Sequence, residues 1–234
     1  MKRARLETAR LPAALAVALA ATAGCTNLFH SDAKPEQTYL LRAPARAAGT
    51  GGTDGTAATA AAAPAAALLG SIQVAHPAAA PGLDGPHIIL LQPDHRSNFY
   101  VGSRWPAPLT DMVEGLAVEA LHGSGDWQSV QDSASPFTSE YLLWISVRRF
   151  EADYSQRHTA PEVEVVLDCT VGAREGRELV ASFVAAGRAT AAADRMADVV
   201  AAFETASDAA LSSLAQQTAA TTRAYAERSA AATH

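Results

Sequence analysis

The first 25 residues constrain most strongly what this chain can fold into, because their pattern indicates that residues 1–24 are not part of the folded protein. Four basic residues lie among the first ten, and an uncharged apolar stretch follows from Leu11 to Ala21. Small residues at 22–24 lead directly to Cys25. A basic start, an apolar centre and a small-residue cleavage site are typical of a secretory signal peptide. We therefore expect residues 1–24 to be cleaved and the fold to come from the rest.

Cys25, directly after the expected cleavage site, carries a second signal. The segment resembles a bacterial lipobox, in which a diacylglycerol alkylates the thiol, the peptide is cut before it, and the new amino group is acylated, typically by palmitate. Two or more acyl chains hold a protein stably on a membrane, whereas one binds reversibly. A transmembrane anchor is the alternative, but the apolar stretch is shorter than the roughly 20 residues that a spanning helix needs. We expect lipidation at Cys25 and attachment to a membrane through the lipid.

The charge of the mature chain narrows the choice of partners. Residues 1–24 hold four of the 18 basic and one of the 24 acidic residues, so the remainder has 14 basic and 23 acidic residues, a net charge of −9. This balance argues against nucleic acid and against charge-driven docking onto anionic lipid. Cys169 has no cysteine to pair with if Cys25 is lipidated, and its strand-like setting predicts a small buried apolar residue.

Composition divides the mature chain into four parts. Residues 25–37 are polar and predict a tether. Residues 43–67 are almost entirely Ala, Gly, Thr and Pro, and a stretch without large side chains cannot offset its ordering entropy, so it predicts a disordered insert. The folded domain is expected over residues 38–215, and residues 216–234 are expected to form a flexible tail.

Apolar periodicity predicts the elements of that domain. Strands are expected at residues 38–41, 68–74, 87–91, 98–101, 141–150, 163–171 and 179–185, of which the last three form an antiparallel meander. One helix is expected from Leu109, after two prolines, to Gly123 or Gly125. A second is expected from the N-cap Thr190 to about Gln216. The pattern favours a single α+β domain, a mixed or antiparallel sheet with two main helices packed on one face.

No pattern in the sequence predicts catalysis, a metal or a cofactor. The seven histidines are scattered and form no His-x₃-His pair. Gly123-Ser124-Gly125 lacks the strand-to-helix setting of a hydrolase nucleophile, and the glycines at 49–55 are not followed by the lysine of a phosphate loop. We expect no catalytic residue, no metal site and no cofactor, and hence a protein that is not an enzyme.

Aromatic residues supply the candidate contact sites. Trp144 lies in the middle of an expected strand, and core packing is its expected role. Trp105 lies at a proline-flanked junction of strand and helix, where an aromatic side chain is either a lid on the core or a contact surface. Because of this loop setting we predict that Trp105, together with Tyr100, contacts a partner or ligand.

The order of these elements resembles the ABC-type transport auxiliary lipoproteins, a family that includes paraquat-inducible protein C. The resemblance covers roughly residues 38–215 and departs from the family at the insert 43–67. The matching segments are Tyr39-Leu40-Leu41 after Cys25, the strand and proline at 70–77, Tyr100 with Trp105, Pro108 and Leu109, and residues 147–151.

The resemblance implies a lipoprotein on the periplasmic face of the outer membrane of a Gram-negative bacterium. Its partners would be an MCE-domain periplasmic protein and ABC transporter subunits that move lipids or hydrophobic compounds. Thr26, in place of the Asp that commonly retains lipoproteins in the inner membrane, favours the outer membrane. A lipoprotein that regulates another envelope enzyme, such as a cell-wall synthase, is the alternative function. The cargo and the formation of a homo-oligomer stay open.

Overall fold

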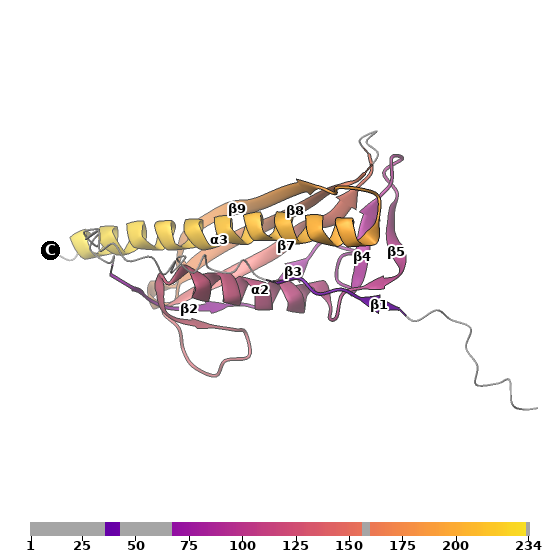
Figure 1. Cartoon of the computed structure of the whole chain (residues 1–234). Helices are drawn as coiled ribbons and strands as arrows, with labels where there is room; N and C mark the ends of the chain where they lie inside the picture. Colours follow the sequence, from indigo (N-terminus) through magenta and orange to yellow (C-terminus); the bar gives the residue numbers. More distant parts are fainter. Residues whose placement is uncertain (1–35, 43–66, 156–159, 233–234) are drawn as a thin grey trace, which may run out of the picture. The chain divides into compact units, whose positions relative to one another are not determined.

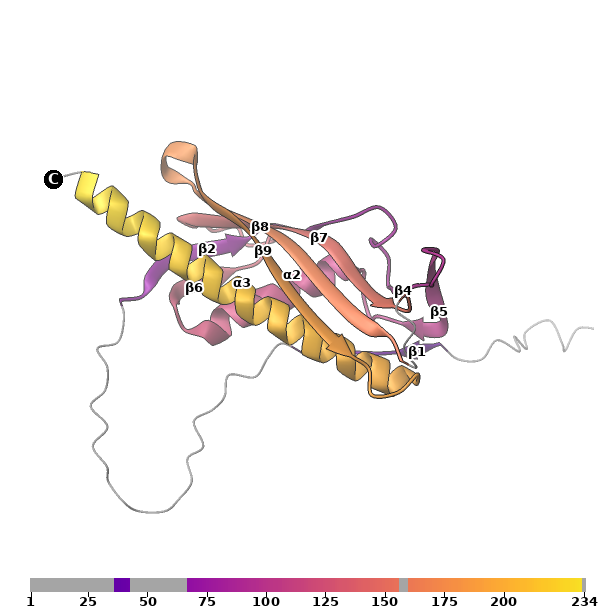
Figure 2. The same cartoon turned by 90° about the horizontal axis from the view of Figure 1, so that it is seen from above.

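The computed structural model describes residues 36–42, 67–155 and 160–232. Residues from Glu36 onward form one unit of contacts, shown in two views in Figures 1 and 2. The signal peptide, Cys25, most of the tether and nearly all of the predicted insert 43–67 lie outside the described residues, so the predictions made for them stay predictions.

A mixed sheet, of nine strands within the described ranges, is built around the long strand β7 (Tyr141–Asp153). Along one side, β7 pairs antiparallel with β8 (Glu162–Ala173), which pairs antiparallel with β9 (Glu178–Thr190). The short turn η1 (Glu175–Arg177) joins β8 to β9. The predicted three-stranded meander is confirmed.

Along its other side, β7 pairs in succession with three shorter parallel strands. These are β2 (Leu69–Val74), β3 (Ala78–Ala79) and β4 (His87–Leu91). The sheet is completed by β6 (Trp127–Gln131) beside β2, β5 (Ser97–Arg104) beside β4, and β1 (Gln37–Thr38) beside β5. Strands β3 and β6 are absent from the prediction, and β1 is shorter than the expected strand at 38–41.

Two helices cover one face of this sheet (Figures 1 and 2). Helix α2 (Leu109–Ser124) follows Pro108 and ends at Gly125, whose φ of 70° is left-handed, a conformation that glycine adopts without strain. Helix α3 (Met196–Ala232) crosses β8 and β9. The α+β class and the placement of both helices on one face are therefore confirmed.

Helix α3 differs most from its prediction. It begins at Met196 rather than directly after Thr190, and it continues to Ala232, so the expectation of a flexible tail from residue 216 is wrong. Thr218 and Thr222 are fully buried there, and their hydroxyls donate to backbone carbonyls one turn back, at 2.7 and 2.8 Å. Ala and Thr, which resemble a polar tail in composition, are here the small residues that let a long helix pack closely.

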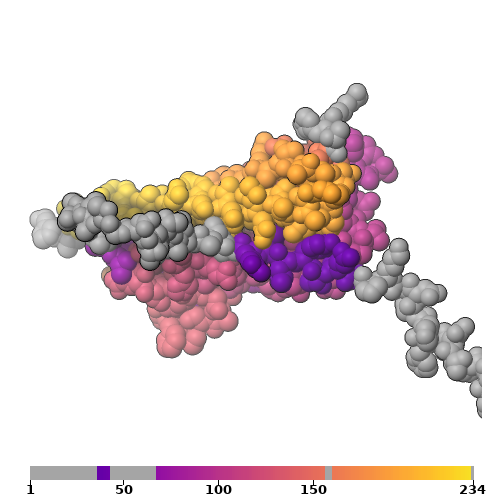
Figure 3. Space-filling model, viewed as in Figure 1, coloured from indigo at the N-terminus to yellow at the C-terminus, as the bar shows by residue number. Residues whose placement is uncertain are grey.

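A single glycine allows this close packing between α3 and β9. A Cβ atom built on Gly187 would lie 2.0 Å from the carbonyl oxygen of Ala206 and 2.9 Å from the amide nitrogen of Ala210. Any side chain at this position would therefore push the helix away from the strand. Seen from the helix side in space-filling form, α3 runs across this face, with residues 36–42 beside its N-terminal part (Figure 3).

The core lies between the helices and the covered face of the sheet. It contains alternate residues of the meander, among them Leu143, Ile145, Val147 and Leu167. Cys169 also points into it and is 1% exposed, which confirms its expected role as a small buried residue. Burial, reinforced by the neighbouring charge of Asp168, raises the pKa of the Cys169 thiol to about 12.

Candidate functional site

The prediction that Trp105 is exposed for partner contact is wrong. Its side chain is 1% exposed, and its indole makes edge-on contacts with Phe150 and Phe203, with ring centroids 6.0 and 5.3 Å apart. The backbone N–H of Trp105 donates to the carbonyl of Pro86 at 2.8 Å, which fixes the junction. Trp105 is the lid on the core, the other role that its sequence position allowed.

Tyr100 points inward from β5 and joins that strand to the start of α3. Its hydroxyl lies 2.9 Å from the hydroxyl of Tyr154, which in turn donates to Asp194 at 2.6 Å. Because the single hydroxyl proton of Tyr154 is donated to Asp194, Tyr100 must be the donor in its hydrogen bond with Tyr154. Burial and this bond raise the pKa of Tyr100 far above its usual range. A contact role for Tyr100 stays a prediction, and its outward-facing neighbours on the strand are Phe99 and Val101, exposed to 46% and 89%.

Trp144 is on the surface, which corrects the expectation of core packing. It is 48% exposed, whereas its neighbours Leu143 and Ile145 are buried beneath the helices. Successive side chains of a strand point to opposite faces, and both helices lie on the face of Leu143. Trp144 therefore projects from the face of the sheet opposite to α2 and α3, which we call the uncovered face because no helix of the described residues lies on it.

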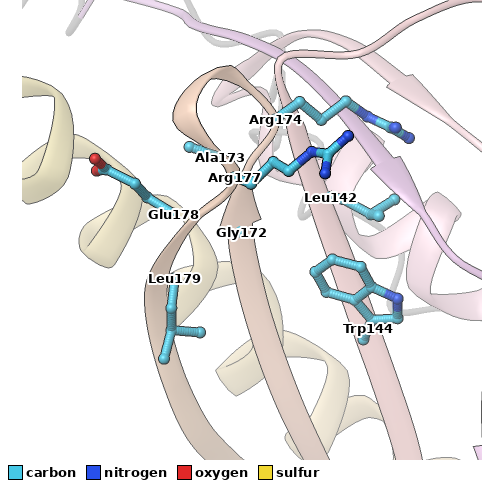
Figure 4. Close-up of a pocket in the computed structure, with 8 residues that line it drawn as sticks. All are labelled: Leu142, Trp144, Gly172, Ala173, Arg174, Arg177, Glu178 and Leu179. Carbon is cyan, nitrogen blue, oxygen red and sulfur yellow. The ribbon is translucent and has the colours of Figure 1, made fainter.

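The uncovered face is hollowed beside Trp144 into an open pocket of about 440 Å³ (Figure 4). Its apolar wall consists of Trp144, Leu142 from the same strand and Leu179 at the start of β9. The indole lies close over Gly172, where a Cβ atom would be 3.0 Å from Cζ3 of the ring. We refer to this hollow as the Trp144 pocket.

Two arginines from the β8–β9 turn form the polar wall of the Trp144 pocket. Arg174 donates to the side-chain oxygen of Gln73 at 2.5 Å and to the hydroxyl of Ser139 at 3.2 Å, and both partners are uncharged. Arg177 has a left-handed φ of 54°. Within the described part of the chain, neither guanidinium is paired with a carboxylate.

Glu178, which follows Arg177 in the sequence, also lines the Trp144 pocket, but its carboxylate is turned away from the two arginines. Figure 4 shows Arg174 and Arg177 extending to the same side of the turn and Glu178 extending to the opposite side. The carboxylate of Glu178 accepts a hydrogen bond from the hydroxyl of Tyr225 on α3, at 2.8 Å. Both arginines of the turn therefore extend away from the carboxylate of Glu178, which is bonded to α3. The charge of Glu175, the other acidic residue of the turn, contributes to raising the pKa of Tyr225.

Elsewhere on the uncovered face, arginines are paired. Arg148 forms an ion pair with Asp168, and Glu164 lies between Arg149 and Arg188 with nitrogen–oxygen distances of 2.5 Å to each. Burial alone would raise the pKa of Glu164, but hydrogen bonds from the two arginines outweigh it and hold the pKa below its usual range. The Trp144 pocket therefore differs from the rest of the face in having two arginines that form no ion pair within the described residues.

The pocket could not be found from the sequence, because four separate segments supply it. The lining residues on β7, the end of β8 and the turn at 174–179, together with Gln73 and Ser139 that hold Arg174, are brought together only by the pairing of β7 with both β2 and β8. Across the described ranges, no group of three or more His, Cys, Asp or Glu residues is placed to hold a metal. The same ranges contain no helix that is both long and apolar enough to cross a membrane.

Comparisons with known proteins place this fold among relatives. A family model described as "ABC-type transport auxiliary lipoprotein component" matches residues 53–219. Among solved structures, protein XCC0632 from Xanthomonas campestris, of family model DUF330, is 30% identical with a TM-score of 0.64, over 70% of this chain and 93% of that chain. Another, called an uncharacterized protein, is similar in fold at 15% identity and a TM-score of 0.52, over 63% and 90% of the two chains. No curated protein matches the chain.

Proposed function

The chain belongs to the family of ABC-type transport auxiliary lipoprotein components, and from this premise we propose that it is a non-enzymatic subunit of an MCE/ABC-type system that moves lipids or other hydrophobic compounds. The observation that carries the proposal is the extent of the family match, which runs over residues 53–219 and so includes α2, the meander and most of α3. In this role the chain binds and positions other molecules, and nucleotide hydrolysis belongs to a separate subunit.

We propose further that the chain is anchored in the outer membrane with its domain in the periplasm. The signal-like start and Cys25 support lipidation, and Thr26 supports sorting to the outer membrane. The polar stretch after Cys25 and the insert 43–67 supply length between the anchor and most of the domain. A tether of this kind would let the domain reach a partner away from the membrane surface.

The reactive groups of the domain support a binding role rather than a catalytic one. The thiol of Cys169 is buried with a raised pKa, so it is a poor nucleophile. Tyr100 and Tyr154 are committed to a chain of hydrogen bonds that ends on Asp194. Glu164 is committed to two arginines. Each of these groups holds elements of the fold together.

We place the contact with a transport partner on the outer side of β5. Val101 is 89% exposed and Phe99 is 46% exposed, and the ring of His87 stacks on Phe99 at a centroid distance of 4.8 Å. Two apolar side chains held outward on one strand are a rigid contact surface of the kind that association buries. Phe99 and Val101 flank Tyr100 on β5. The contact is therefore placed on the predicted strand, but it is made by these two side chains.

Affinity purification of the full-length tagged chain from detergent-solubilised envelope, followed by mass spectrometry, tests the proposal. We expect an MCE-type periplasmic protein and ABC transporter subunits to co-purify. Val101→Asp should reduce their recovery, while Val184→Asp, the same change at a 49% exposed position on β9, should not. Recovery of cell-wall synthases alone would contradict the proposal and support the alternative of an envelope-enzyme regulator.

A further inference from the structure

We propose that the Trp144 pocket binds one anionic amphiphile, with its acyl chain against Trp144, Leu142 and Leu179 and its phosphate or carboxylate group at Arg174 and Arg177. This inference rests on the proposed role in moving lipids or hydrophobic compounds, and it adds that this subunit itself contacts a lipid. It also names the charge of the lipid and the residues that select it.

The apolar wall is suited to a hydrocarbon chain. Trp144 and Leu179 are 48% and 67% exposed, large fractions for side chains of this size and polarity, and they line the same hollow. Because Gly172 has no side chain, the indole can lie close against the strand while it lines the pocket. A flexible chain laid along these groups would remove their apolar surface from water, which favours binding.

The cationic wall is suited to an anionic headgroup. Gln73 and Ser139 hold Arg174 in place without neutralising it, because both are uncharged. A guanidinium fixed in this way can form parallel hydrogen bonds to a phosphate or carboxylate with little ordering cost. Arg177 adds a second positive charge from the same turn, and Glu178 is held on the other side by Tyr225.

The positive charge of Arg174 and Arg177 is confined to the pocket, so it favours single anionic molecules over an anionic membrane surface. The mature chain has 23 acidic against 14 basic residues, and the arginines elsewhere on the uncovered face, Arg148, Arg149 and Arg188, are paired with Asp168 or Glu164. An anionic membrane surface is therefore repelled by the chain as a whole, while a single anionic molecule is attracted at the pocket.

The size of the pocket and its two kinds of wall favour an amphiphile over other occupants. The volume of about 440 Å³ lies within the usual range for small-molecule sites, roughly 300–1,000 Å³. A free phosphate ion would use the arginines and leave Trp144 and Leu179 in water. A neutral hydrocarbon would use the apolar wall and leave two unpaired cations beside it. Only a molecule with both parts satisfies both walls.

A fluorescence titration of the full-length chain in phosphatidylcholine nanodiscs tests the inference. The added probe is dihexanoyl-phosphatidic acid, and we expect a saturable change in tryptophan emission that Trp144→Phe abolishes. Trp105 and Trp127 are 1% and 7% exposed, so their emission should stay constant. Arg174→Gln with Arg177→Gln should weaken the affinity about tenfold.

The matched control removes two arginines of the same face that are already paired. Arg148→Gln with Arg188→Gln changes the net charge equally and should leave the affinity within about twofold of the original value. An equal loss in both double variants would overturn the pocket assignment. Thermal melting checks the folding of each variant. If the loss of Arg174 unfolds the chain, Arg177→Gln alone is used, because the Arg177 side chain makes no hydrogen bond within the described residues.

Two further probes separate the chemical sources of the signal. Equal affinity for dihexanoyl-phosphatidylcholine would overturn the selection of anionic headgroups, and equal affinity for inorganic phosphate would reduce the pocket to a simple anion site and overturn the amphiphile. Co-purification of transport subunits shows whether the proposed function holds even when the proposed lipid binding does not. Partners recovered without lipid binding would overturn only the pocket assignment.

Discussion

Replacing Trp105 by alanine should destabilise the domain strongly, whereas the same change at Trp144 should not. Trp105 is 1% exposed and packs edge-on against Phe150 and Phe203. Removing a buried tryptophan costs about 3–5 kcal/mol through lost burial and the cavity left behind. Trp144 is 48% exposed and lies outside the core, so its truncation should cost less than about 1 kcal/mol.

The size of this difference makes it easy to measure. A domain has a total stability of roughly 5–15 kcal/mol, so the loss at Trp105 removes a large part of it. At about 2–4 °C per kcal/mol for a chain of this size, Tm should fall by roughly 6–20 °C for Trp105→Ala. Thermal melting of the two full-length variants, followed by far-ultraviolet circular dichroism, gives both values.

Two outcomes would refute this reasoning. A Tm for Trp105→Ala within about 3 °C of the parent chain would show that the aromatic cluster is not a packed core. A fall for Trp144→Ala as large as that for Trp105→Ala would show that the uncovered face is packed in solution. Below its Tm, Trp105→Ala should also retain its transport partners in affinity purification, because a core lid makes no contact of its own.

Three further predictions follow from packing, charge and the N-terminal signal. Gly187→Ala should destabilise the chain by about 1–3 kcal/mol, because its Cβ would meet the backbone of α3, whereas Gly115→Ala, in open space on α2, should stabilise it by about 0.5–1 kcal/mol; melting curves compare them. Glu164→Gln should lower Tm at pH 7. Because the folded-state pKa of Glu164 lies below 4.5, this deficit should persist above pH 4.5 and vanish as the pH falls through the lowered pKa; a constant deficit over that range would contradict it. Cys25→Ser should leave an unlipidated precursor by mass spectrometry, and Thr26→Asp should move the protein to the inner-membrane fraction of a density gradient; an unmodified Cys25 in the native protein would contradict both.

The elements that depend on local pattern were predictable from the sequence. Helix α2 has prolines at its start and Gly125 at its end, and both signals act within a few residues. The meander is rich in β-branched residues, as at 163–171, and in aromatic residues, as at 141–150. In these segments the local pattern and the final packing agree, so the fold class followed from them.

The remaining features depend on contacts between distant segments. The extension of α3 beyond residue 216 comes with the burial of small residues such as Thr218, Ala219 and Thr222, which composition alone does not show. The run 141–145 (Tyr, Leu, Leu, Trp and Ile) is hydrophobic at all five positions, so it has no alternation that would identify the face of the sheet opposite to the helices. For this reason neither the exposure of Trp144 nor the Trp144 pocket was predicted. The loop setting of Trp105 allowed both a core lid and a contact surface, and only the packing against Phe150 and Phe203 decides between them.

Site-specific photo-cross-linking in the intact envelope tests the central claim, that this lipoprotein works as a transport subunit through its folded domain. A photo-reactive phenylalanine analogue placed at position 101, on the exposed side of β5, should form an adduct with an MCE-type or ABC transporter subunit, identified by mass spectrometry. The same analogue at position 184 should not form that adduct. Adducts from position 101 with cell-wall synthases alone, or with no envelope protein, would contradict the account.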